Sequence, residues 1–84
     1  MKLQYKLNRD VVARTATMLN WDLSQLHSSI HIQSDERVIN GKSLLGILSA
    51  QYKMGDIITV IFDDERDLNK IKEIFNELGG EYNG

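Results

Sequence analysis

The spacing of apolar residues switches along the chain between two periods, and this switching limits the folds that the chain can adopt. Lys2 to Leu7 has an apolar side chain at every second position, which is typical of a half-buried β-strand. From Val12 onward the apolar side chains fall three or four residues apart, which predicts an amphipathic helix of about four turns. The positions on this helical face are Val12, Ala16, Leu19, Leu23 and Leu26. Asn8 or Asp10 is expected to cap the helix.

The same two periods recur through the rest of the chain. Ser29 to Gln33 and Arg37 to Ile39 are predicted strands, and the polar turn between them indicates a hairpin. Ser43 to Ser49 is predicted to form a short apolar helix, and Ile57 to Phe62 a β-branched strand. The Gly79-Gly80 pair is expected to end a second long amphipathic helix. The apolar positions of that helix are Leu68, Ile71, Ile74, Phe75 and Leu78.

This order of elements, βαββαβα, predicts an α+β open-faced sandwich. We expect a four-stranded antiparallel sheet with three helices on one face and the other face open to water. The last strand departs from clean alternation, because Ile57 and Ile61 point outward if Ile58 points inward. The chain has 84 residues, so we expect one domain over residues 1–84.

Composition excludes several classes of function. The chain has no cysteine, which excludes disulfides and thiolate metal sites, and His27 and His31 lack a third ligand at a suitable spacing. The net charge is −2 with scattered lysines and arginines, which argues against binding to nucleic acid or to an acidic membrane. No apolar run could span a bilayer or serve as a signal peptide, so a cytoplasmic protein is expected. A chain this short buries a thin core, so we expect neither an enzyme nor a bound cofactor.

Two segments resemble the HPr family, the histidine-containing phosphocarriers of the phosphotransferase system. Asn40 to Ser49 looks like the regulatory serine segment of HPr, in which an Asn-x-Lys-Ser stretch opens a short apolar helix. Val12 to Thr17 is similar to the phosphohistidine segment, His-Ala-Arg-Pro-Ala. The spacing between the two segments matches without gaps, and Gly55 falls where the family has glycine. The resemblance covers nearly the whole chain and implies the HPr fold.

Departures from the family pattern bear directly on function. Val12 stands where HPr has the phosphate-accepting histidine, and Thr15 replaces the proline that follows. Gln51 occupies the position of a glycine that usually follows the short helix. Phosphate relay needs a nucleophilic imidazole nitrogen, which valine lacks. The resemblance therefore implies a degenerate active site at Val12 and Thr15, with no catalytic residue.

The serine segment is retained, and the resemblance gives Ser43 a role. In HPr proteins of Gram-positive bacteria the matching serine is phosphorylated by a dedicated kinase, and the product is a corepressor for a transcription factor. The catabolite repression HPr-like proteins lack the histidine, keep this serine and serve regulation. Ser43 is therefore the candidate phosphorylation site, and the HPr kinase and a transcription factor or enzyme are the implied partners. The alternative is that Ser43 only caps the short helix.

A partner-binding surface is predicted beside Ser43. Three large apolar side chains on barely two helical turns cannot all face the core. The predicted contact residues are Arg14, Trp21, Leu44, Leu45 and Leu48. Two of them have an alternative interpretation: Arg14 as a solvated side chain and Trp21 as an ordinary, partly buried aromatic residue.

The leading hypothesis is a non-catalytic, HPr-like regulatory protein that acts in carbon catabolite regulation through protein–protein contacts, switched by phosphorylation of Ser43. The alternative is a self-associating structural protein with the HPr fold, a homodimer formed through Ile57 and Ile61 on the open sheet face. Phosphotransfer through Ser43 or Thr15 is a third interpretation, but neither residue has a neighbouring base in the sequence.

Overall fold

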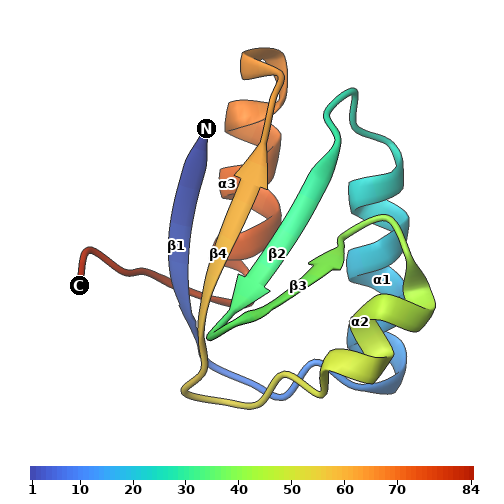
Figure 1. The fold of residues 1–84 in the computed structure, drawn as a ribbon, viewed down its shortest axis with the longest axis vertical. Coiled ribbons are helices and arrows are strands. Elements are labelled where there is room, and N and C mark those ends of the chain that lie inside the picture. The colour runs from blue at the N-terminus through green and yellow to red at the C-terminus, as the bar shows by residue number, and fades with distance from the viewer.

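An antiparallel sheet with three α-helices on one face forms the molecule (Figure 1), and the computed structural model describes residues 1–84. The strands are β1 (Lys2–Leu7), β2 (Ile30–Ser34), β3 (Arg37–Asn40), β4 (Ile57–Phe62) and β5 (Gly79–Glu81). The helices are α1 (Ala13–Ser24), α2 (Leu44–Ala50) and α3 (Leu68–Asn76), with a short 3₁₀-helix, η1 (Glu65–Asp67), before α3. The predicted α+β open-faced sandwich is confirmed.

The sheet has the order β3-β2-β4-β1-β5, so β4 is central and its neighbour β1 lies far from it in the sequence. β1 pairs with β4 in the register Lys2 opposite Ile61 and Lys6 opposite Ile57. β2 pairs with β4 on the other side, and the predicted β2–β3 hairpin is present. All of these pairings are antiparallel.

The core lies between the sheet and the helices. Alternation along the strands turns every second side chain toward the helices, including Tyr5, Ile32 and Val60, each of which has no exposed surface. The helices contribute side chains at helical spacing, including Leu23 and Phe75. The ring of Phe75 stacks on that of Tyr5 with their centroids 5.5 Å apart. Together these side chains belong to one cluster of 17 buried residues, and this cluster holds the helices on the sheet.

The beginning of α1 differs from the prediction. Val12 is the N-cap residue, and neither Asn8 nor Asp10 caps the helix. The carboxylate of Asp10 instead accepts a hydrogen bond from the Met54 N–H at 2.8 Å, across the adjacent loop. Val12 is 57% exposed and does not belong to the apolar face, whereas Val11 is buried. The helical spacing does not apply to these two neighbouring valines, because Val12 is still extended and the helix begins only at Ala13.

The second difference is a fifth strand in place of a simple helix stop. α3 ends at Asn76, and the chain then extends as β5 along the outer edge of β1. Gly79 lies so close to β1 that a Cβ atom at this position would overlap the carbonyl oxygen of Lys6. The missing side chain therefore allows the strand to form, and the sheet has five strands rather than the four predicted.

Candidate functional site

Ser43 begins the short helix α2 as its N-cap residue. Its backbone is extended, with φ −104° and ψ 113°, and its Oγ accepts a hydrogen bond from the Gly46 N–H at 3.1 Å. A serine in this position satisfies one of the N–H groups that lack a partner at the start of a helix. The residue is half-buried. The predicted capping role is therefore present, and it is compatible with modification of the same hydroxyl.

The segment before Ser43 is held by hydrogen bonds to two other elements. The Gly41 N–H donates to the carbonyl oxygen of Ile30 at 2.8 Å, which ties the segment to β2. The ammonium group of Lys42 donates to the carbonyl oxygen of Leu26 at 2.7 Å, just beyond α1. The side-chain oxygen of Asn40 accepts the Lys42 N–H at 2.9 Å. These bonds fix the position of Ser43 relative to α1.

The three predicted contact leucines of α2 divide between core and surface. Leu44 is half-buried and packs against the core, beside the fully buried Ile47. Leu45 is 80% exposed and Leu48 is 41% exposed. α2 packs against α1 (Figure 1), and the exposure of these two leucines adds apolar area to the surface of the molecule.

On α1 the predicted contact residues are also at the surface. Arg14 and Trp21 are seven positions apart, which places them on the same helical face two turns apart. Trp21 is 67% exposed, so most of its surface is open to water. Arg14 is exposed as well. We call Arg14, Trp21, Leu45 and Leu48 the helical surface.

Val12 and Thr15, the predicted degenerate active site, lie at the start of α1. The Val12 side chain is exposed and offers no nucleophile and no capping bond. Ala13, the next residue, has a positive φ of 46°. The Thr15 N–H, a donor that proline lacks, bonds to the carbonyl oxygen of Val12 at 3.0 Å. A hydrogen bond in the first turn of α1 therefore joins the two residues of the predicted degenerate site.

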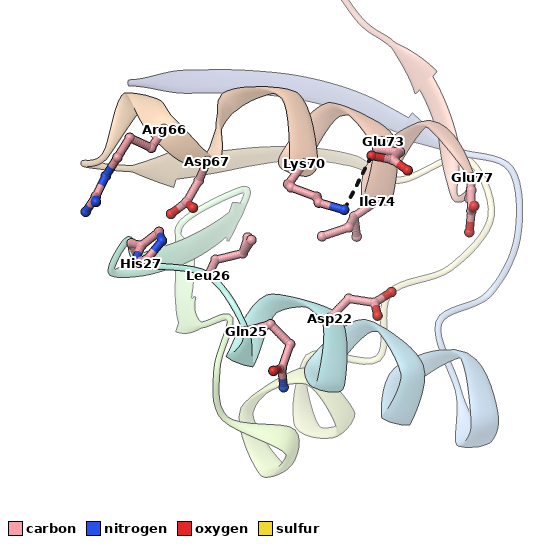
Figure 2. Close-up of a pocket in the computed structure, with 10 residues that line it drawn as sticks. All are labelled: Asp22, Gln25, Leu26, His27, Arg66, Asp67, Lys70, Glu73, Ile74 and Glu77. Carbon is pink, nitrogen blue, oxygen red and sulfur yellow. Dashed lines mark ion pairs between the residues drawn. The ribbon is translucent and has the colours of Figure 1, made fainter.

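A separate hollow of about 440 Å³ lies between the end of α1 and α3 (Figure 2). Leu26 and Ile74 are its only apolar lining residues, and the other lining side chains are polar or charged, with both acidic and basic groups among them. The guanidinium group of Arg66 at one end already pairs with Asp64 at 2.7 Å. None of the predicted site residues lines this hollow, and no group of three or more His, Cys, Asp or Glu side chains is arranged to hold a metal ion.

Asp67 beside this hollow is a buried carboxylate that the sequence did not single out. It is 3% exposed and accepts a hydrogen bond from the Ser28 N–H at 2.6 Å. Burial opposes the charged form, but hydrogen bonds from Ser28 and the nearby His27 outweigh it and lower the pKa of Asp67. Asp67 thus holds the turn before β2 against η1. No local signal could reveal it, since Ser28 lies 39 residues away.

The architecture and the serine-capped helix together define a class, the open-faced α+β phosphocarrier-like proteins. The family model described as the PTS HPr component phosphorylation site matches residues 2–77. The chain therefore belongs to the HPr family, whose members are phosphocarrier-like proteins rather than enzymes in the ordinary sense. No helix combines the length and the apolar character needed to cross a membrane.

Several known proteins are similar to this chain. The HPr-like protein Crh of Halalkalibacterium halodurans is 29% identical over 68 residues, which cover 79% of this chain and 81% of that protein. The crystal structure of the phosphocarrier protein HPr from Bacillus anthracis covers 93% of each chain at 23% identity, with a TM-score of 0.78. The structure of Bacillus subtilis Crh, described as a dimer with a swapped domain, covers 87% of each chain at 24% identity, with a TM-score of 0.70. At such identities the two structures support the fold alone.

Proposed function

We propose that this chain, acting as a single domain over residues 1–84, is a non-catalytic regulatory member of the HPr family that works through protein–protein contacts. The observation that carries the proposal is the contrast between the two family segments. The start of α1 has an exposed valine and no nucleophile, whereas the serine segment retains its helix and its capping serine. Similarity to Crh, which is described in Bacillus subtilis as a catabolite repression protein, supports carbon catabolite regulation as the process.

Exposure of the helical surface supports a contact role. Leu45 is 80% exposed and Trp21 is 67% exposed, so both leave large apolar areas in water. A partner that covers such area gains about 25 cal/mol of binding free energy for each Å². Tryptophan and arginine are also the residue types that most often carry binding energy at protein interfaces. Arg14 adds a positive charge on the same face of α1 as Trp21.

Phosphorylation of Ser43 is the proposed switch. A phosphate would add about −1.5 to −2 charges at the first turn of α2, close to Leu45. Negative charge is favourable at a helix N-terminus, so the modification does not oppose the local fold. The new charge would lie beside the helical surface and present a partner with a combined apolar and anionic site. By family resemblance the modifying enzyme is the HPr kinase.

A pair of substitutions tests the helical surface as the contact site. Leu45→Asp is expected to reduce binding of the kinase-treated protein to the family's transcription factor at least about tenfold, because a charge would have to be buried without a partner. Val38→Asp is the matched control, since Val38 is 51% exposed but lies on the open face of the sheet. Calorimetric titration measures both. Equal affinities for the two variants would contradict the proposal.

Self-association is a second candidate function. Ile57 on the open sheet face is 38% exposed, and Ile61 is half-buried there. The dimer described for Bacillus subtilis Crh adds support. However, Lys6 and Lys2 lie opposite these two isoleucines, and they would repel a second copy face to face, so this function ranks second. Light scattering at increasing concentration tests it, with Ile61→Lys expected to abolish any dimer.

A further inference from the structure

The outer edge of β1 is covered only by the short strand β5. Backbone groups of alternate residues point to opposite edges of a strand. The Leu7 N–H donates to the carbonyl oxygen of Asp56, toward β4, so the polar groups of Lys2, Gln4 and Lys6 point away from β4. β5 reaches part of this edge, with Tyr5, Lys6 and Leu7 in register with Glu81, Gly80 and Gly79. In Figure 1 the red C-terminal segment crosses at the lower end of β1 and then leads away from the strand.

β5 is a weak cover. Two of its three residues are glycines, which lose the most conformational freedom when a strand forms. Gly80 and Glu81 are exposed, and Gly79 has no side chain to bury, so β5 places no side chain in the core. Its attachment therefore rests on backbone hydrogen bonds, such as the one from the Tyr82 N–H to the Gln4 carbonyl oxygen at 2.8 Å. Strands held in this way open locally more readily than core strands.

Part of the edge has no strand partner. The pairing with β5 ends at Tyr5, and the Tyr82 N–H extends it only to Gln4. Lys2 and Leu3 lie beyond this point, so the edge-facing backbone groups of Lys2 have no strand partner. An incoming extended chain would find a free template there and could continue along β1 by displacing β5.

The charges on the open sheet face beside this edge have one sign. Lys2 and Lys6 are exposed and point to that face, because Tyr5 and Leu7 between them point into the core. No strand residue that faces the same way is acidic: these residues are Gln4, His31, Gln33, Val38, Asn40, Ile57, Thr59, Ile61 and Gly80. Lys6 lies opposite Gly80, which offers no side chain to pair with. A strand with acidic side chains at these positions would complement the lysines across the pair.

We propose that the outer edge of β1 binds an extended acidic segment of a partner protein as an added strand, in the place that β5 occupies in the free chain. A second copy is a poorer occupant, since antiparallel pairing of two β1 edges centred on Gln4 would set Lys2 of each copy against Lys6 of the other. The site lies on the sheet and is separate from the helical surface, so it does not depend on Ser43.

The test uses the full chain and a short capped peptide that alternates glutamate with valine. Nitrogen-labelled protein is titrated with the peptide, and amide shifts are followed. We expect the Lys2, Gln4 and Lys6 amides to shift most, with no comparable effect from a peptide that alternates lysine with valine. Gly79→Ala, which displaces β5 from the Lys6 carbonyl, is expected to tighten binding about tenfold, because the peptide then has no competitor.

A second pair of variants applies if Gly79→Ala does not fold. The space around Gly80 is open, and Gly80→Glu gives Lys6 an acidic partner within the chain. We expect it to weaken peptide binding about two- to fivefold relative to Gly80→Gln, which has the same shape without the charge. Absence of shifts along β1, or equal binding of the acidic and basic peptides, would overturn the proposal. The proposal would also be overturned if Gly79→Ala formed dimers and did not bind the peptide, because a second copy of the chain would then occupy the edge.

Discussion

Gln51 ends α2 in the left-handed conformation, with φ 54° and ψ 46°, where a side chain crowds the backbone. Gln51→Gly is therefore expected to raise the free energy of unfolding by about 1 kcal/mol, because glycine adopts this conformation without strain. Gln25→Gly is the matched control, since Gln25 ends α1 with a right-handed backbone of φ −82°. The free energy of unfolding of the Gln25→Gly variant should fall by about 0.5–1 kcal/mol. Urea denaturation of both variants measures the difference, and a less stable Gln51→Gly variant would refute the argument.

Asp67 makes stability depend on pH. Its pKa is lowered by folding, so its contribution is fully present above its ordinary value of 3.8 and is lost as the pH falls through the folded value. Asp67→Ala is expected to cost about 1–3 kcal/mol at neutral pH, because the buried Ser28 N–H loses its acceptor. The difference from the parent chain should shrink below pH 3.8. Asp63→Ala, which removes the acceptor of the exposed Ser29 N–H, serves as the milder control in thermal melts.

At the scale of elements, Gly79 decides whether β5 forms. Gly79→Ala is expected to detach β5 and to lower the free energy of unfolding by about 1–3 kcal/mol, the worth of a few backbone hydrogen bonds. Gly80→Ala should change stability by less than about 1 kcal/mol, because nothing lies near its added methyl group. Hydrogen exchange at Gln4 and Lys6 reports the opening directly. Retained protection of these amides in Gly79→Ala would mean that β1 can shift to accommodate the methyl group.

The elements differ in how well their sequences predict them. The bounds of β1 follow from its clean alternation, which records the buried face, whereas those of β4 follow from its run of β-branched residues. The sequence does not predict β5, because its two glycines carry no side chains that could alternate. The Gly79-Gly80 pair is also typical of the end of a helix. The start of α1 was missed by one residue, since its N-cap is an exposed valine with no capping side chain.

At the scale of the whole molecule, the candidate site could be predicted only where its chemistry is local. Ser43 was predicted as a helix cap from the apolar run that follows it, and the structure places it there. The division of the α2 leucines between core and surface required the packing of α2 on the sheet and α1. The contact between Asp67 and Ser28 joins residues that are far apart in the sequence. Local sequence patterns therefore could not predict it.

The central claim is that the chain retains the regulatory serine while lacking the phosphocarrier histidine. The most direct test is the intact mass of the purified protein after incubation with the HPr kinase and ATP. We expect the addition of a single phosphate that is absent in Ser43→Ala. An unchanged mass, with authentic HPr phosphorylated in the same tube, would contradict the claim and leave Ser43 as the cap of α2.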